Sequence, residues 1–105
     1  MPGFSRISPE QAVALLDAEA EFVDIRDLQS FGQSHIAGAT HLCNETLQDY
    51  IAQANKSRPL VVYCYHGNSS QNAAQFFCDQ GFNEVMSMDG GFEAWRQAYP
   101  VTGQN

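Results

Sequence analysis

The sequence is poor in basic residues, with 5 lysines and arginines against 12 aspartates and glutamates and a formal net charge of −7. So acidic a chain offers no basic surface to neutralise phosphates, which argues against nucleic acid or an anionic membrane as its partner. It also lacks an apolar run of the roughly 20 residues that a membrane span needs. The first residues, MPGFSRISPE, lack the apolar stretch of a secretory signal. We therefore expect a cytoplasmic protein without membrane contact.

Cysteine is scarce as well, and the three that occur are Cys43, Cys64 and Cys78. An odd number without a C-x-x-C pair argues against both a disulfide framework and a structural zinc site. His41 and Cys43 are close in sequence, but two ligands do not make a metal site. We interpret Cys43 and Cys78 as bystander thiols, and we expect no bound metal.

The chain has the length and composition of one globular domain, 1–105. Short apolar runs predict strands at 21–25, 40–42, 60–64 and 84–88, with 60–64 as a central strand because it is apolar on both faces. Helical patterns between them predict helices from a Ser8 cap to about 18, within 28–39 before a glycine turn, from an Asn44 cap to 54, over 70–80 and over 91–99. This alternation predicts an α/β fold with a parallel sheet.

The stretch VVYCYHGNSS, residues 61–70, places Cys64 between the predicted central strand and a predicted helix. Ligands of open parallel sheets bind at the carboxyl ends of the strands, and a helix N-terminus presents unpaired amides to an anion. Gly67 lets the backbone turn tightly, and Asn68 tolerates unusual dihedral angles. We expect a lowered pKa and a reactive thiolate at Cys64. The alternative, a packed core thiol, does not require so polar a sequence after it.

The loop after Cys64 is free of acidic residues in the sequence. No aspartate or glutamate occurs between Asp49 and Asp79, which spares the loop negative charge that would disfavour a thiolate or an anionic substrate. Lys56 and Arg58 fall in the same window but precede the strand. Because five strand residues span about 17 Å, we expect both side chains at the opposite end of the sheet as surface charges.

Three stretches resemble signatures of the rhodanese (thiosulfate sulfurtransferase) family, in particular its small single-domain bacterial members of the GlpE type. The first, VDIRDLQSFGQSHIAGA (23–39), has Ser34 where glycine is usual. It matches the N-terminal signature at Asp24, Arg26, Phe31, His35, Ile36, Gly38 and Ala39. CYHGNSS is similar to the active-site loop. MDGGFEAW (88–95) resembles the C-terminal signature through Gly90, Gly91, Phe92, Ala94 and Trp95. The three follow one another in the family's order.

The resemblance implies a rhodanese-like α/β fold, with a parallel sheet of about five strands flanked by helices. It also implies a double displacement: Cys64 takes a sulfane sulfur from thiosulfate or a related donor as a persulfide, then passes it to cyanide or a thiol acceptor. The substrate and the persulfide charge would be bound by the loop residues Tyr65, His66, Gly67, Asn68, Ser69 and Ser70. The sulfur rides on the protein, so neither a metal nor an organic cofactor is implied.

The loop departs from the many family members that carry basic residues directly after the cysteine. Tyr65 and His66 stand there, and an unperturbed histidine is mostly neutral at pH 7. The expectation is therefore weak thiosulfate binding, with room for another physiological donor. Ser69 stands where the family often has threonine, and two roles stay open for its hydroxyl: bonding the sulfur or capping the helix.

The remaining signature residues are interpreted as structural. Asp24 and Arg26 are expected to form an ion pair at a strand end, and His35 to be packed and hydrogen-bonded rather than a general base. Gly90 and Gly91 are expected to form a tight turn that brings the last helix against the sheet. The aromatic residues of the same signature, expected in the core or the pocket wall, are Phe92 and Trp95.

Other functions compete with sulfur transfer. A cysteine phosphatase or arsenate reductase needs an arginine six positions after the cysteine to hold its oxyanion, and Ser70 stands there, which excludes that reading. A non-catalytic rhodanese-like module or a protein-to-protein sulfur relay through Cys64 stays open as the alternative.

Overall fold

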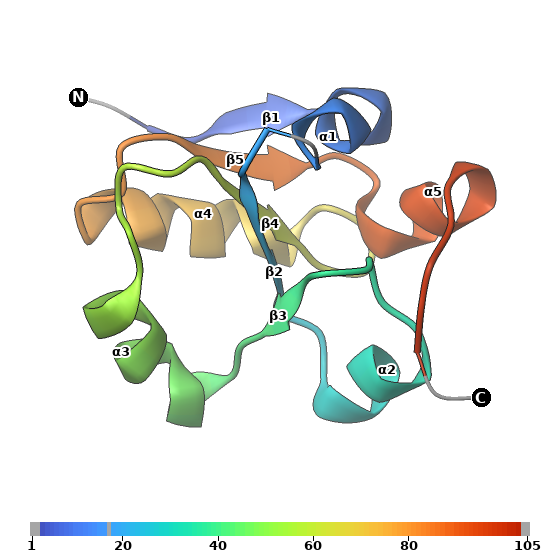
Figure 1. Cartoon of the computed structure of the whole chain (residues 1–105), viewed down its shortest axis with the longest axis horizontal. Helices are drawn as coiled ribbons and strands as arrows, with labels where there is room; N and C mark the ends of the chain where they lie inside the picture. Colours follow the sequence, from blue (N-terminus) through green and yellow to red (C-terminus); the bar gives the residue numbers. More distant parts are fainter. Residues whose placement is uncertain (1–2, 17, 104–105) are drawn as a thin grey trace.

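The computed structural model describes residues 3–16 and 18–103 (Figure 1). Strands and helices alternate along the chain, as the sequence predicts. The strands are β1 (Ser5–Ile7), β2 (Glu21–Asp24), β3 (Thr40–His41), β4 (Leu60–Tyr63) and β5 (Val85–Met88). The helices are α1 (Pro9–Leu15), α2 (Leu28–Gln33), α3 (Asn44–Gln53), α4 (Ser69–Asp79) and α5 (Gly91–Ala98).

The strands form one parallel sheet in the order β1-β5-β4-β2-β3, which confirms the predicted parallel α/β fold. Strand β4 lies at its centre, as expected for the 60–64 run. Its side chains alternate between two cores: Val61 and Tyr63 face the core shared with α1 and α5, and Leu60 and Val62 face the core shared with α3 and α4. The sheet is therefore covered by helices on both faces (Figure 1).

The first strand, β1, was not predicted from the sequence pattern. Of its three residues only Ile7 is buried, so the segment has no apolar run to signal a strand. It becomes a strand because it pairs with β5, where Arg6 lies opposite Ser87 and Ile7 opposite Met88. The strand is thus set by its partner and not by local propensity.

Some predicted boundaries shift by one or more residues. The Ser8 cap, with its capping box, is confirmed, but α1 ends at Leu15 instead of near residue 18. The cap of α3 is Cys43, with Asn44 as the first helical residue. The central strand stops at Tyr63, so Cys64 is the first residue of the loop. Among residues 3–16 and 18–103, none of the helices has the length and apolar character that a membrane span requires.

Asp24 and Arg26 form the buried ion pair that the sequence predicts. The guanidinium of Arg26 donates from Nη2 to Asp24 Oδ2 at 2.7 Å and from Nε to Oδ1 at 3.1 Å. The side chain of Arg26 is 4% exposed and that of Asp24 is 0% exposed. Nη2 also donates to the carbonyl of Ser34, and the guanidinium lies 4.0 Å from the ring centre of Phe92. This pair ties the end of β2 to the segment after α2 and to α5.

We predict that Asp24→Asn lowers the free energy of unfolding by about 3 kcal/mol, because it leaves the buried Arg26 charge without its counter-ion. Urea denaturation measures the loss. Arg6→Gln is the matched control, since Arg6 pairs with Asp89 through side chains that are 60% and 41% exposed. That change is expected to cost less than about 1 kcal/mol. Equal losses in the two variants would contradict a special role for the buried pair.

Candidate active site

Cys64 lies at the carboxyl end of the central strand, with 5% of its surface exposed. Its sulfur accepts a hydrogen bond from the amide of Gly67 at 3.2 Å and another from the amide of Ser70 at 3.3 Å. The loop from 64 to 70 therefore curls around the sulfur. The first turn of α4 supplies one of the two donors, as expected from the unpaired amides at a helix N-terminus.

This environment favours the thiolate. Burial opposes ionisation of the Cys64 thiol, but hydrogen bonds from the hydroxyl and amide of Ser70 and from the amides of Gly67 and His66 outweigh it, so the pKa of Cys64 falls below its ordinary value. The lowered pKa agrees with the expectation from the sequence. By contrast, burial and the neighbouring charge of Asp79 raise the pKa of Cys78.

The first turn of α5 fixes the direction of the loop peptides. The amide of Phe92 donates to the carbonyl of Cys64 at 2.7 Å, and the amide of Glu93 donates to the carbonyl of Tyr65 at 3.0 Å. In a trans peptide the carbonyl oxygen and the following amide hydrogen point in opposite directions. The amides of Tyr65 and His66 are thereby turned away from α5.

Two glycines allow this close approach. Gly67 has φ +92°, and a Cβ there would lie 2.8 Å from the amide nitrogen of Gly90. Gly91 has φ +58°, and a Cβ there would lie 2.5 Å from the carbonyl oxygen of Cys64. No side chain fits at either position. The tight turn predicted at Gly90 and Gly91 is confirmed, and it positions the loop as well as the last helix.

The loop encloses a small cavity of about 140 Å³, lined by Cys64, Tyr65, His66, Asn68 and Ser69. Cys64 forms its buried part, and the other four residues are exposed. Gly67 and Ser70 are buried and contact the sulfur through their amides. The structure thus brings together all seven residues that the sequence singled out, in two roles: sulfur contacts and cavity rim.

Tyr65 is anchored to α2 and does not extend freely over the cavity. Its hydroxyl donates to the carboxylate of Asp27, the N-cap of α2, and lies 2.8 Å from the hydroxyl of Ser30. Hydrogen bonds from Tyr65 and Ser30 lower the pKa of Asp27 to about 2. A carboxylate therefore lies beside the loop. The absence of acidic residues between Asp49 and Asp79 in the sequence gives no sign of this carboxylate, because Asp27 belongs to a segment that is distant in the chain.

The roles of the two loop serines differ from the sequence-based expectation. Asn68 is the N-cap of α4, so Ser69 does not cap the helix. The hydrogen bond that α4 gives to the Cys64 sulfur comes from the amide of Ser70. The Ser70 hydroxyl lies 2.7 Å from the hydroxyl of Ser87 in β5, a residue that the sequence analysis missed. The sequence signal that could have revealed Ser87 is a lone serine inside the otherwise apolar run VMSM.

The remaining polar residues take structural positions. Arg58 pairs with Glu21 at the start of β2, which confirms that it lies at the opposite end of the sheet from Cys64. His35 stacks on Phe31 with ring centres 3.8 Å apart, and its Nδ1 bonds the carbonyl of Phe31, which confirms a packed histidine. Phe92 and Trp95 are buried in the core, as predicted.

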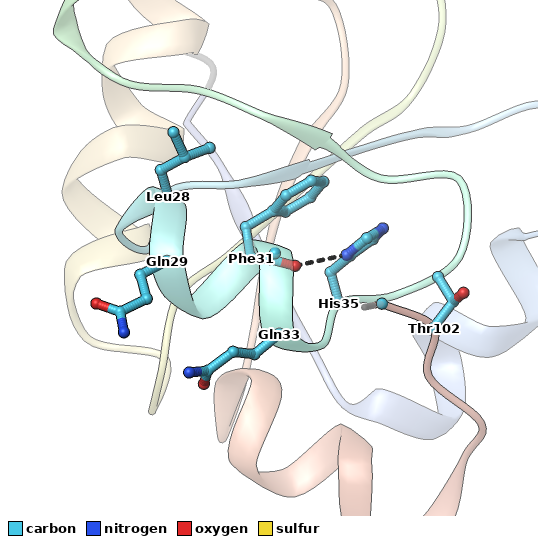
Figure 2. A pocket seen from close by; sticks show the side chains of 8 residues that line it. Leu28, Gln29, Phe31, Gln33, His35 and Thr102 are labelled. Carbon is cyan, nitrogen blue, oxygen red and sulfur yellow. Dashed lines mark hydrogen bonds between the residues drawn. The ribbon is translucent and has the colours of Figure 1, made fainter. Parts of the chain in front are cut away.

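Outside the 64–70 loop, the described residues form a larger hollow but no cluster of metal-binding side chains. Among residues 3–16 and 18–103 no group of three potential metal-binding side chains lies close enough to hold an ion. A larger hollow, of about 830 Å³, lies between α2 and the segment around Thr102 (Figure 2). Figure 2 shows Phe31 and His35 side by side along it, with Leu28 and Gln29 at the start of α2. None of its lining residues belongs to the 64–70 loop.

Comparison with known proteins agrees with this geometry. The family model described as a rhodanese-like domain matches residues 8–98. A protein of Pseudomonas aeruginosa (strain LESB58) named thiosulfate sulfurtransferase GlpE is 57% identical over 98 residues, covering 93% of this chain and 89% of the relative. A protein of the same name from Stutzerimonas stutzeri is 56% identical over 100 residues, covering 95% and 92%.

Solved structures of lower identity share the fold. A rhodanese-like domain from Anabaena sp. superposes with a TM-score of 0.83 at 25% identity, covering 99% of this chain and 81% of that one. A rhodanese-related protein from Thermoplasma volcanium gives 0.83 at 24% identity, covering 96% and 100%. With a family model that spans most of its length and relatives above 50% identity, the chain belongs to the rhodanese family.

Proposed function

We propose that the chain is a thiosulfate sulfurtransferase that carries the transferred sulfur as a persulfide on Cys64. The observation that carries the proposal is the environment of the Cys64 sulfur. At the carboxyl end of the central strand, this sulfur accepts hydrogen bonds from the amides of Gly67 and Ser70. Relatives above 50% identity, named thiosulfate sulfurtransferase and matched over nearly their whole length, support the sulfurtransferase activity.

In the first step the Cys64 thiolate attacks the outer sulfur of thiosulfate. The sulfur–sulfur bond of thiosulfate breaks, sulfite leaves with the bonding electron pair, and the outer sulfur remains on Cys64 as a persulfide anion. The lowered pKa of Cys64 supports this role, since the thiolate is the nucleophile. No proton has to move in this step once the thiolate is formed.

The amides around the loop would then stabilise the persulfide. The backbone of the loop is preorganised to bind a negatively charged sulfur. The amides of Gly67 and Ser70 already donate to Cys64, and the peptides of Tyr65 and His66 are held in place by α5. Such fixed donors require no reorganisation as charge shifts. In the second step an acceptor, cyanide or a thiol, attacks the outer sulfur, and the Cys64 thiolate is the leaving group.

We assign substrate binding to the loop backbone and to the cavity rim. The sequence contains neither lysine nor arginine between Arg58 and Arg96, and the guanidinium of Arg26 is buried against Asp24. Thiosulfate would therefore be held by amides and by the N-terminus of α4, with Tyr65, His66, Asn68 and Ser69 around it. This arrangement predicts modest affinity for the dianion.

The alternatives differ in what Cys64 does. A non-catalytic module has no need of a thiol with a lowered pKa. The lowered pKa of Cys64 therefore favours a catalytic role over that alternative. A protein-to-protein sulfur relay would form the same persulfide on Cys64, but its sulfur donor would be a protein. Unlike a thiosulfate sulfurtransferase, such a relay would not take sulfur from free thiosulfate. The free thiols Cys43, Cys64 and Cys78 support a reducing, cytoplasmic location as part of the proposal.

Cys64→Ser is expected to abolish sulfur transfer and to leave the fold unchanged, because it removes only the nucleophile. Intact mass after incubation with thiosulfate would show one added sulfur on the parent and none on the variant. Cys43→Ser is the matched control, since Cys43 is exposed, and it should retain full thiocyanate production. Thiocyanate production by the Cys64→Ser variant would overturn the assignment, and an unmodified parent would favour the relay.

The thiols should differ in their pH dependence of alkylation. Because the pKa of Cys64 is lowered, its rate with iodoacetamide should rise and level off at lower pH than for an ordinary thiol. Because the pKa of Cys78 is raised, its rate should still be rising where that of Cys64 is flat. Peptide mapping by mass spectrometry follows both thiols in one sample. Coinciding profiles would contradict the thiolate at Cys64.

His66→Lys is expected to lower the KM for thiosulfate. His66 is exposed at the cavity rim, so an added cation near the α4 N-terminus should contribute about 0.3–1 kcal/mol, roughly two- to fivefold in KM. The gain should shrink as salt is added. His66→Gln serves as the uncharged control. An unchanged KM in the lysine variant at low salt would show that position 66 does not face the bound dianion.

A further inference from the structure

Asp27 is an exposed carboxylate that hydrogen bonds hold beside the 64–70 loop. It is the N-cap of α2, and its side chain accepts the amide of Ser30 at 3.0 Å and the hydroxyl of Ser30 at 2.9 Å. It also accepts the hydroxyl of Tyr65, the residue that directly follows Cys64 and lines the small cavity. The negative charge is therefore held from two sides, by α2 and by the loop.

This carboxylate is ionised at neutral pH and lies close to the loop backbone. Hydrogen bonds from the Tyr65 hydroxyl and from Ser30 lower the pKa of Asp27 to about 2. One tyrosine side chain separates the charge from the backbone next to Cys64. That length is shorter than the Debye length, about 8 Å at physiological ionic strength, so salt weakens the field of Asp27 at the loop without removing it.

The basic side chains of the protein are all engaged elsewhere. Four of the five form ion pairs, and Lys56 donates to the carbonyl of Ile51. The four pairs are Arg6–Asp89, Arg26–Asp24, Arg58–Glu21 and Arg96–Glu93. These five side chains lie within residues 3–16 and 18–103, and none of them neutralises Asp27.

An anion that approaches Cys64 therefore meets two opposing interactions. The amides of Gly67 and Ser70 attract it at short range, while the carboxylate of Asp27 repels it in proportion to its charge. We propose that Asp27 is a specificity-determining residue, which makes the loop accept monoanionic and uncharged sulfur compounds in preference to dianions such as thiosulfate. The inference rests on the proposed function. It narrows the donors that suit this loop to sulfane compounds with at most one negative charge, such as thiosulfonates and organic persulfides.

Asp27→Asn tests the charge alone, since asparagine has the same shape, is an equally good N-cap and still offers an oxygen to Tyr65. At low ionic strength, kcat/KM for benzenethiosulfonate, a monoanionic donor, should rise roughly twofold. Because the Coulomb energy is proportional to the charge of the donor, the rise for the thiosulfate dianion should be the square of that, roughly fourfold. Both gains should vanish at about 1 M ionic strength, where the Debye length is about 3 Å.

The matched control is Asp49→Asn, which removes the same formal charge from the chain. Asp49 is exposed in α3 and lines a separate hollow with Glu21 and Arg58, at the opposite end of the sheet from Cys64. This variant should keep the parent's kcat/KM for both donors. If urea unfolding shows that Asp27→Asn does not fold, Asp27→Ser replaces it, because serine is also a favoured and uncharged N-cap.

Alkylation of Cys64 makes the same comparison without sulfur transfer. Iodoacetate is an anion and iodoacetamide is uncharged, and with both the Cys64 thiolate displaces iodide and forms a sulfur–carbon bond. A change in the pKa of Cys64 alters both rates equally, so it cancels in their ratio. Asp27→Asn should raise the ratio of the iodoacetate rate to the iodoacetamide rate roughly twofold at low ionic strength. Asp49→Asn should leave it unchanged, and peptide mapping isolates Cys64 from the other thiols.

An alkylation ratio that is the same in the Asp27 and Asp49 variants overturns the inference, and so do equal gains for the monoanionic and the dianionic donor. A roughly twofold rise in the ratio that salt abolishes supports it. A parent that takes sulfur from neither donor would overturn the proposed function, while the alkylation ratio would still judge Asp27.

Discussion

The site depends on one close approach, between the loop after β4 and the glycine turn after β5. The two strands are neighbours in the sheet, so their carboxyl ends bring these turns together. The gap has no room for a Cβ at Gly67 or Gly91, and the amides of α5 bind the carbonyls of Cys64 and Tyr65 across it. Those two hydrogen bonds turn the amides of Tyr65 and His66 away from α5. Within the same loop, the amides of Gly67 and Ser70 donate to the Cys64 sulfur.

The electrostatics of the site are short-ranged. The chain carries a net charge of −7 and is proposed to bind a dianion, so the overall field opposes the substrate. The carboxylate of Asp27 beside Tyr65 adds to that opposition, and the cation of Arg26 is neutralised by Asp24. What favours an anion is the set of amides within a few ångströms of Cys64. Amide dipoles act only at short range, so the proposed site would favour small anions that fit inside the loop.

The buried pair of Asp24 and Arg26 gives this loop a rigid neighbour. The guanidinium lies between the end of β2 and the ring of Phe92, and it also faces the ring of Tyr65 at 5.7 Å. Because Phe92 supplies the amide that binds the Cys64 carbonyl, the ion pair supports the same helix turn that orients the loop. Stability and site geometry are therefore coupled through one buried charge pair.

The sequence by itself determined the α/β alternation, the central position of the 60–64 run and the loop around Cys64, because apolar periodicity, glycines and a polar stretch after a buried strand are local signals. It determined the buried pair as well, since Asp24 and Arg26 are close in the chain. Only the tertiary structure decided that Ser5–Ile7 is a strand, since β5 supplies its partners. It alone brought Asp27 to Tyr65, and Ser87 to Ser70. These contacts join segments that are distant in the chain, and no local pattern of charge or hydrophobicity encodes which distant side chain will fill a neighbouring position in the sheet.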